Sequence, residues 1–171
     1  MKNFPTTIKR VETLNFLHKS VVIMTTEDII KEKTSADHLL YVSLKYTKTC
    51  DVILNLIARW KNLLEISFDT LIIHYVEKEK IPHLPQSPKQ RIEFMKTYFK
   101  KFVKIQNVIP MYIFFKRIPD LNKTREGEFR KNVNLKIIEP TKTTVINMEQ
   151  LGEYAQVIEE FNEETKKILS D

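Results

Sequence analysis

Glycine is scarce in this sequence, with only 2 residues among 171. Tight turns and strands rely on glycine, so the shortage favours long helices joined by turns of proline and asparagine. The chain is long enough to bury a core of its own. Its 42% hydrophobic and 29% charged residues are typical of a folded protein rather than a disordered one. We therefore expect a mainly α-helical protein.

Cysteine and long apolar runs are also missing. The single cysteine, Cys50, excludes an internal disulfide and suits a reducing compartment, and its helical spacing predicts a buried, structural thiol. The longest nearly uncharged apolar run, Val108 to Phe115, is far shorter than the about 20 residues that cross a bilayer. The N-terminal residues lack the apolar centre of a signal peptide. These absences predict a cytoplasmic protein that does not contact a membrane.

The usual signatures of metal, cofactor and covalent catalysis do not occur. No HxxxH or ExxH pairing, the usual spacings of zinc and di-iron ligands on a helix, occurs; the histidines are His18, His38, His74 and His83. Gly127 and Gly152 are isolated, so no phosphate-binding loop or dinucleotide fingerprint can be built. We expect no metal and no cofactor, and most standard enzyme classes become improbable.

An apolar stripe at helical spacing dominates residues 35–80. Its apolar and aromatic residues recur every three or four positions and so share one helical face; they are Leu39, Val42, Tyr46, Cys50, Ile53, Ile57, Trp60, Leu64, Phe68, Leu71 and Tyr75. We expect one long central helix that Ser35 caps, with a bend or break near residues 65–67. Residues 35–171 would form a single helical-bundle domain, and residues 1–34 an N-terminal extension packed on it.

The remainder of the chain is divided by its prolines. Ser87 and Pro88 predict the start of a second helix. Pro110 is expected to interrupt the helical pattern, and a short helix is expected around 123–133. Two runs rich in β-branched residues, 135–139 and 143–147, predict a small β-hairpin. An amphipathic helix with early acids and late lysines is expected to end the chain.

Charge is unevenly distributed along the sequence. Residues 89–136 contain 13 lysines and arginines against 4 acids, a net charge of +9, whereas residues 149–171 contain 2 bases and 7 acids, a net charge of −5. A basic surface attracts polyanions such as nucleic acids. Solvated helices whose basic face is neutralised by the acidic tail are an equally good interpretation.

The stretch REGEFRKN, residues 125–132, concentrates the candidate site residues. Arginine forks suit phosphate contacts, so Arg125, Arg130 and Lys131 are candidate phosphate ligands and Asn132 a polar contact. Lys100 and Lys104, on the basic side of the second helix, complete the candidate set. The aromatic residues Tyr112, Phe114 and Phe115 can stack on bases, although such residues in an apolar run are more often core. A solvated helix end remains the alternative.

The chain has a family resemblance that rests on the order of its segments. These are YVSLKYTKTCDVILNLIARW, PHLPQSPKQ and EFRKNVNL, followed by a short hairpin and an acidic terminal helix. Over residues 28–169 it resembles an archaeal member of the HEPN superfamily. The resemblance implies an up-and-down helical bundle that is commonly dimeric. Many HEPN proteins are metal-independent ribonucleases or toxins, and some pair with a nucleotidyltransferase antitoxin.

The chain departs from the family's catalytic motif, an arginine followed after four to six residues by histidine. In such a motif the arginine stabilises phosphate charge while the histidine moves a proton. Here Arg125 is followed after six residues by Asn132, which does not titrate. We therefore expect a non-catalytic HEPN-like homodimer that binds RNA, a nucleotide or a protein partner, such as a nucleotidyltransferase, through its basic face. The alternatives are a divergent HEPN ribonuclease and a structural or assembly subunit without a ligand.

Overall fold

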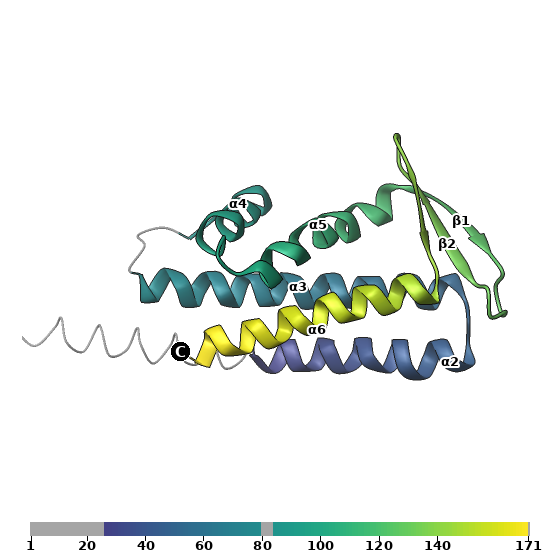
Figure 1. Cartoon of the computed structure of the whole chain (residues 1–171), viewed down its shortest axis with the longest axis horizontal. Coiled ribbons are helices and arrows are strands. Elements are labelled where there is room, and N and C mark those ends of the chain that lie inside the picture. The colour runs from purple at the N-terminus through teal and green to yellow at the C-terminus, as the bar shows by residue number, and fades with distance from the viewer. Residues whose placement is uncertain (1–25, 80–83, 171) are drawn as a thin grey trace, which may run out of the picture.

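The protein is mainly α-helical and carries a small antiparallel sheet at one end (Figure 1). The computed structural model describes residues 26–79 and 84–170. The first helix covers residues 26–46 and includes a π-helical turn, η1 (Leu39–Ser43), and the short α2 (Leu44–Tyr46). The long α3 (Cys50–Lys78) packs against the other helices, α4 (Pro88–Tyr98), α5 (Val103–Arg117) and α6 (Met148–Ser170). The predicted predominance of helix is confirmed.

The prediction of one long helix that begins after Ser35 and breaks only near residues 65–67 is wrong, because the chain breaks at residues 47–49. Thr49 is extended and its hydroxyl accepts the Val52 N–H, which caps the start of α3. Ser35 is not a cap; it lies inside the first helix and donates its hydroxyl to the Lys31 carbonyl. The break expected near residues 65–67 does not occur, since α3 runs through it.

The predicted N-terminal extension ends within a helix. Residues 1–25 lie outside the described part of the chain, whereas residues 26–34 belong to the same helix as residues 35–38. Ile29 and Ala36 of this helix are both buried in the core. The proposed boundary at residue 35 therefore falls inside a packed helix.

Proline marks one helix start and is tolerated inside another helix. Ser87 and Gln90 form a reciprocal capping box at the start of α4, and Pro88 occupies its first turn, as predicted. Pro110 does not interrupt the chain; it lies inside α5, on the exposed side. Its missing N–H leaves the carbonyl four residues earlier without that partner.

The strands β1 (Asn122–Glu126), β2 (Asn134–Ile138) and β3 (Thr143–Ile146) form the sheet in that order. The hairpin of β2 and β3 confirms the prediction for residues 135–147. The short helix expected around 123–133 is wrong, because residues 122–126 are a strand paired antiparallel with β2. After it comes a turn that contains most of REGEFRKN.

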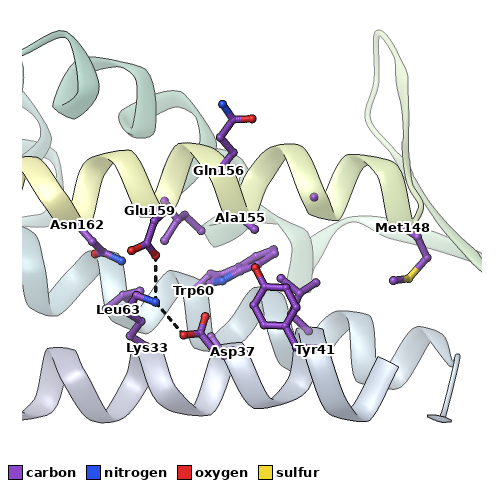
Figure 2. Close-up of a pocket in the computed structure, with 14 residues that line it drawn as sticks. Lys33, Asp37, Tyr41, Trp60, Leu63, Met148, Ala155, Gln156, Glu159 and Asn162 are labelled. Atoms are coloured by element: carbon purple, nitrogen blue, oxygen red, sulfur yellow. Dashed lines mark hydrogen bonds and ion pairs between the residues drawn. The ribbon is translucent and has the colours of Figure 1, made fainter. Parts of the chain in front are cut away.

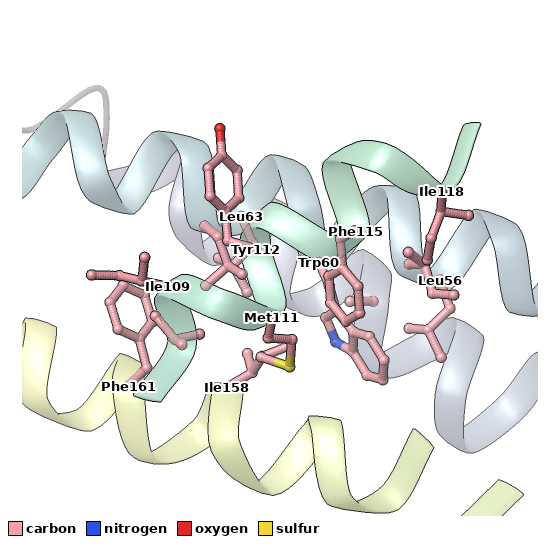
Figure 3. Packing of buried hydrophobic residues seen from close by; sticks show 14 of the residues in the cluster. Leu56, Trp60, Leu63, Ile109, Met111, Tyr112, Phe115, Ile118, Ile158 and Phe161 are labelled. Atoms are coloured by element: carbon pink, nitrogen blue, oxygen red, sulfur yellow. The ribbon is translucent and has the colours of Figure 1, made fainter. Parts of the chain in front are cut away.

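The core lies where α3, α5 and α6 meet (Figure 3). Trp60 stacks on Phe115 with ring centroids 6.1 Å apart, and Phe68 packs edge-on against Tyr112 and Phe161. The amphipathic terminal helix is confirmed as α6, which contributes Leu151, Ile158 and Phe161 to the core. Among the helices of residues 26–79 and 84–170, none has the length and apolar character that a membrane crossing requires.

Candidate functional site

The turn between β1 and β2 is fastened to the break before α3. The Phe129 N–H donates to the Lys48 carbonyl oxygen over 2.7 Å. The Cys50 N–H donates to the Glu128 carboxylate over 3.1 Å, which places a negative charge at the positive end of the α3 dipole. Segments about 80 residues apart in the sequence therefore meet at one end of the molecule (Figure 1).

Left-handed backbone at Gly127 and Phe129 shapes this turn. Both residues have φ of 64°. At Gly127, a Cβ would come within 2.6 Å of the Asn132 carbonyl oxygen, so the turn requires glycine there. Phe129 is the only residue other than glycine with positive φ in the described chain, and this conformation costs about 1–2 kcal/mol. The anchored turn thus holds Phe129, a residue with a large side chain, in an unfavourable backbone conformation.

Arg125, the leading candidate for a phosphate contact, is already paired with acids. Its guanidinium lies 2.7 Å from the Asp51 carboxylate and 3.7 Å from that of Glu128. The hydrogen bond from Arg125 lowers the pKa of Asp51 and raises the pKa of Arg125 itself. Arg125 thus links β1 to the start of α3, and its charge is balanced within the chain.

Other basic residues of this region are also engaged. Lys123 donates to the carbonyls of Ile118, Pro119 and Leu121, in and directly after the 3-10 turn η2 (Ile118–Asp120) that follows α5. Lys136 lies 2.6 Å from Glu126 across β1 and β2. Much of the positive charge counted in the sequence therefore serves internal contacts.

Arg130 and Lys131 remain exposed, and within the described residues neither forms an ion pair. The Phe129 ring beside them is 78% exposed. Across the Phe129–Lys48 hydrogen bond, the Tyr46 ring is 76% exposed, and Lys45 lies over it at 5.7 Å. These two segments together form a basic, aromatic surface that we call the tip surface; its residues are Lys45, Tyr46, Lys48, Phe129, Arg130 and Lys131.

The remaining candidates lie elsewhere or play other parts. Lys100 and Lys104 lie at the α4–α5 connection, at the far end of α5 from the sheet, so the structure does not bring them to the tip surface (Figure 1). Lys104 is 3.9 Å from Glu163 of α6. Asn132 is exposed, and its backbone carbonyl oxygen accepts a hydrogen bond from the Asn134 side-chain amide. Tyr112 and Phe115 are buried, which confirms that they are core residues.

Sequence reasoning misses half of the tip surface. The apolar spacing places Lys45, Tyr46 and Lys48 in the middle of a continuous helix, and it does not single out Phe129. A signal for the break exists in KYTKTC, where Thr49 precedes Cys50 and Asp51 as an N-cap followed by an acid in the first turn. No local pattern indicates that this break contacts residues 128–129.

The described residues were also compared with the requirements of a metal centre and of a reactive thiol. In the described part of the chain, no group of three or more histidine, cysteine, aspartate or glutamate side chains is placed to hold a metal ion. Cys50 is fully buried, and its thiol donates to the Asn134 carbonyl over 3.3 Å. Burial raises the pKa of the thiol, which makes Cys50 a poor nucleophile. Its prediction as a buried structural residue is confirmed.

Comparison with known proteins gives no match: no protein-family model, no curated protein and no solved structure is similar to this chain.

Proposed function

We propose that the protein is a non-catalytic binding domain whose tip surface binds single-stranded RNA. The observation that carries the proposal is the hydrogen bond between Phe129 and Lys48, which joins two segments that each present an exposed aromatic ring beside basic side chains. Basic groups that follow the backbone and aromatic rings on which bases stack are the two components of single-strand recognition.

The shape of the tip surface favours a single strand over a duplex. The Phe129 and Tyr46 rings are largely exposed, and a base stacks on such a ring only when it is free of its own neighbours. A duplex keeps its bases stacked and offers phosphates alone. Binding to phosphates alone would not explain why a large aromatic residue, Phe129, occupies a position with positive φ.

The absence of catalysis in the proposal follows from the residue types. Asn132 occupies the position where an RNA-cleaving motif has histidine, and a carboxamide cannot transfer a proton. Arg125 is engaged by Asp51 and Glu128.

The HEPN resemblance stays part of the proposal, supported by the mainly helical fold and its acidic last helix. The homodimer that it implies is a further prediction, which light scattering on the purified protein tests.

Titration of a fluorescently labelled oligouridine at about 50 and 200 mM salt tests the proposal. We expect binding that weakens steeply at the higher salt, and labelled RNA that stays intact in the presence and absence of a chelator. No binding at the lower salt would refute RNA binding. Cleavage that persists with the chelator would instead show a divergent ribonuclease.

A further inference from the structure

The first helix is fastened to α6 by charged side chains. Lys33 of the first helix lies 2.8 Å from the Asp37 carboxylate and 3.0 Å from that of Glu159 of α6, as the dashed lines in Figure 2 show. Trp60 and Leu63 of α3 border the same contact and are 2% and 0% exposed. This side of the bundle is therefore closed by contacts within the chain, whereas the small sheet ends in an open edge.

Strand β3 forms that edge, because the strand order is β1-β2-β3 and β3 pairs with β2. The Glu139 N–H donates to the Lys142 carbonyl oxygen over 2.9 Å and closes the β2–β3 hairpin. In an antiparallel pair, hydrogen-bonded positions alternate with positions that are not hydrogen-bonded. Counted from the closing pair in the observed register, Thr144 bonds to β2, whereas the N–H and C=O groups of Thr143 and Val145 point away from it.

These outward groups are available to another strand. Within residues 26–79 and 84–170, neither Thr143 nor Val145 forms a backbone hydrogen bond outside the sheet. Both residues are exposed, Val145 to 40%, and Ile138, which faces Thr143 in the register, is 43% exposed. An unpaired edge is a row of donors and acceptors on which a further strand can pair.

The other edge strand, β1, carries a protection that β3 lacks. Lys123, Arg125 and Glu126 place charges along β1, and the Arg125 guanidinium is fixed to Asp51 of α3. Charged side chains on an edge oppose pairing with another chain. The β3 sequence TTVI consists of β-branched residues and has no charge, proline or glycine. Of the two edges, β3 is therefore the one suited to pairing between molecules.

We propose that β3 pairs with β3 of a second copy of this chain, so that two three-stranded sheets join into one continuous sheet. Antiparallel pairing has two-fold symmetry, which makes a strand edge its own complement. In the register centred on Thr144, Thr143 of each copy lies opposite Val145 of the other. This register uses every outward N–H and C=O group of both strands, and it brings no like charges opposite each other.

The proposed pairing assigns an interface to the homodimer that the family resemblance implies. It is independent of RNA binding, because no residue of the tip surface belongs to β3. A dimer formed in this way leaves the tip surface of each copy open.

A cysteine at position 144 tests the register. The two Thr144 residues face each other at a position without hydrogen bonds, where Cα atoms are about 4.5 Å apart, within the range of a disulfide. Cys50 is 0% exposed and does not compete. With diamide as oxidant, we expect Thr144→Cys to form a disulfide-linked dimer on a non-reducing gel. Thr124→Cys, at an exposed position of β1, is the matched control and should cross-link at least about tenfold more slowly.

Sedimentation measures the association itself. We expect the average mass of the wild type to rise from the 20.4 kDa of one chain toward twice that value as the protein concentration increases. Thr143→Lys with Val145→Lys places like charges opposite each other across the two-fold axis and should weaken self-association at least about tenfold. Asn122→Lys with Thr124→Lys adds the same charge at exposed positions of β1 and should associate like the wild type.

A wild-type chain that stays monomeric would overturn the proposal and would leave this edge to a strand of another protein or to none. A dimer that the lysines at positions 143 and 145 do not weaken, or equal cross-linking of the two cysteine variants, would place the interface elsewhere and overturn it as well. The RNA titration is unaffected by either result. If the double-lysine variant at β3 fails to fold, Thr144→Cys decides alone: its disulfide-linked dimer supports the pairing, and the lack of one overturns it.

Discussion

The Phe129 N–H donates to the Lys48 carbonyl oxygen over 2.7 Å, and this bond joins the turn after β1 to the break before α3. Joined, they place two exposed aromatic rings and four basic side chains at one end of the helical bundle. The proposed binding of RNA depends on this junction.

Phe129 is predicted to strengthen RNA binding and to lower the free energy of unfolding. Phe129→Gly relieves the positive φ and should raise the free energy of unfolding by about 0.5–1 kcal/mol. It also removes a stacking ring, so the free energy of RNA binding should weaken by about 1–3 kcal/mol. Chemical denaturation and RNA titration measure the two effects. Phe129→Tyr keeps the ring and should keep the affinity; equal losses in both variants would exclude stacking.

The two glycines are predicted to respond oppositely to alanine. Gly127→Ala introduces a Cβ against the Asn132 carbonyl at positive φ and should lower the free energy of unfolding by at least about 1 kcal/mol. Gly152→Ala meets no atom and gains helix propensity, so it should raise that free energy by about 1 kcal/mol. Urea denaturation of both variants checks the signs. A neutral Gly127→Ala would mean that the turn is not built as described.

The Arg125–Asp51 pair is predicted to stabilise the fold in a pH-dependent way. Its hydrogen bond lowers the pKa of Asp51 in the folded state. A lowered pKa adds stability above the unfolded value of about 4, and this stability is lost as the pH falls through the lower folded value. Arg125→Ala should therefore be less stable than the wild type at pH 7, and the difference should shrink in acid.

Asp51→Asn is the matched control for that pH dependence, because it removes the titrating group and should show the same trend. A stability difference between Arg125→Ala and the wild type that does not change with pH would contradict the assignment. Both side chains are largely exposed, so the effect at neutral pH is expected to be small.

Much of the fold follows from local sequence. Ser87 and Gln90 have the reciprocal spacing of a capping box, and the β-branched runs around Pro140 identify the β2–β3 hairpin. The break at residues 47–49 is easily missed, although Thr49 signals it, because apolar residues keep helical spacing across it. Strand β1 cannot be recognised from the sequence either, because its residues are all polar and lack the alternation of apolar and polar side chains that indicates a strand. Its pairing with β2 is a tertiary contact.

The candidate site is less predictable for the same reason. Arg130 and Lys131 can be recognised from their residue types, whereas Tyr46 and Lys48 reach the site through a tertiary contact across about 80 residues. Arg125 has the sequence signature of a phosphate ligand, but the folded chain supplies Asp51 as its partner. Composition reveals a basic region, and only the fold reveals which of its charges are already balanced.

The most direct test compares two double variants that carry the same charge change. Arg130→Ala with Lys131→Ala removes the exposed bases of the tip surface, whereas Lys166→Ala with Lys167→Ala removes exposed bases near the other end of α6. In oligouridine titrations at several salt concentrations, the first variant should bind at least tenfold more weakly, with a salt slope reduced by about 1 for each phosphate that is no longer neutralised. The second should bind almost like the wild type. Equal losses of affinity in the two variants would show that net charge alone attracts RNA, and would contradict a binding site at the tip surface.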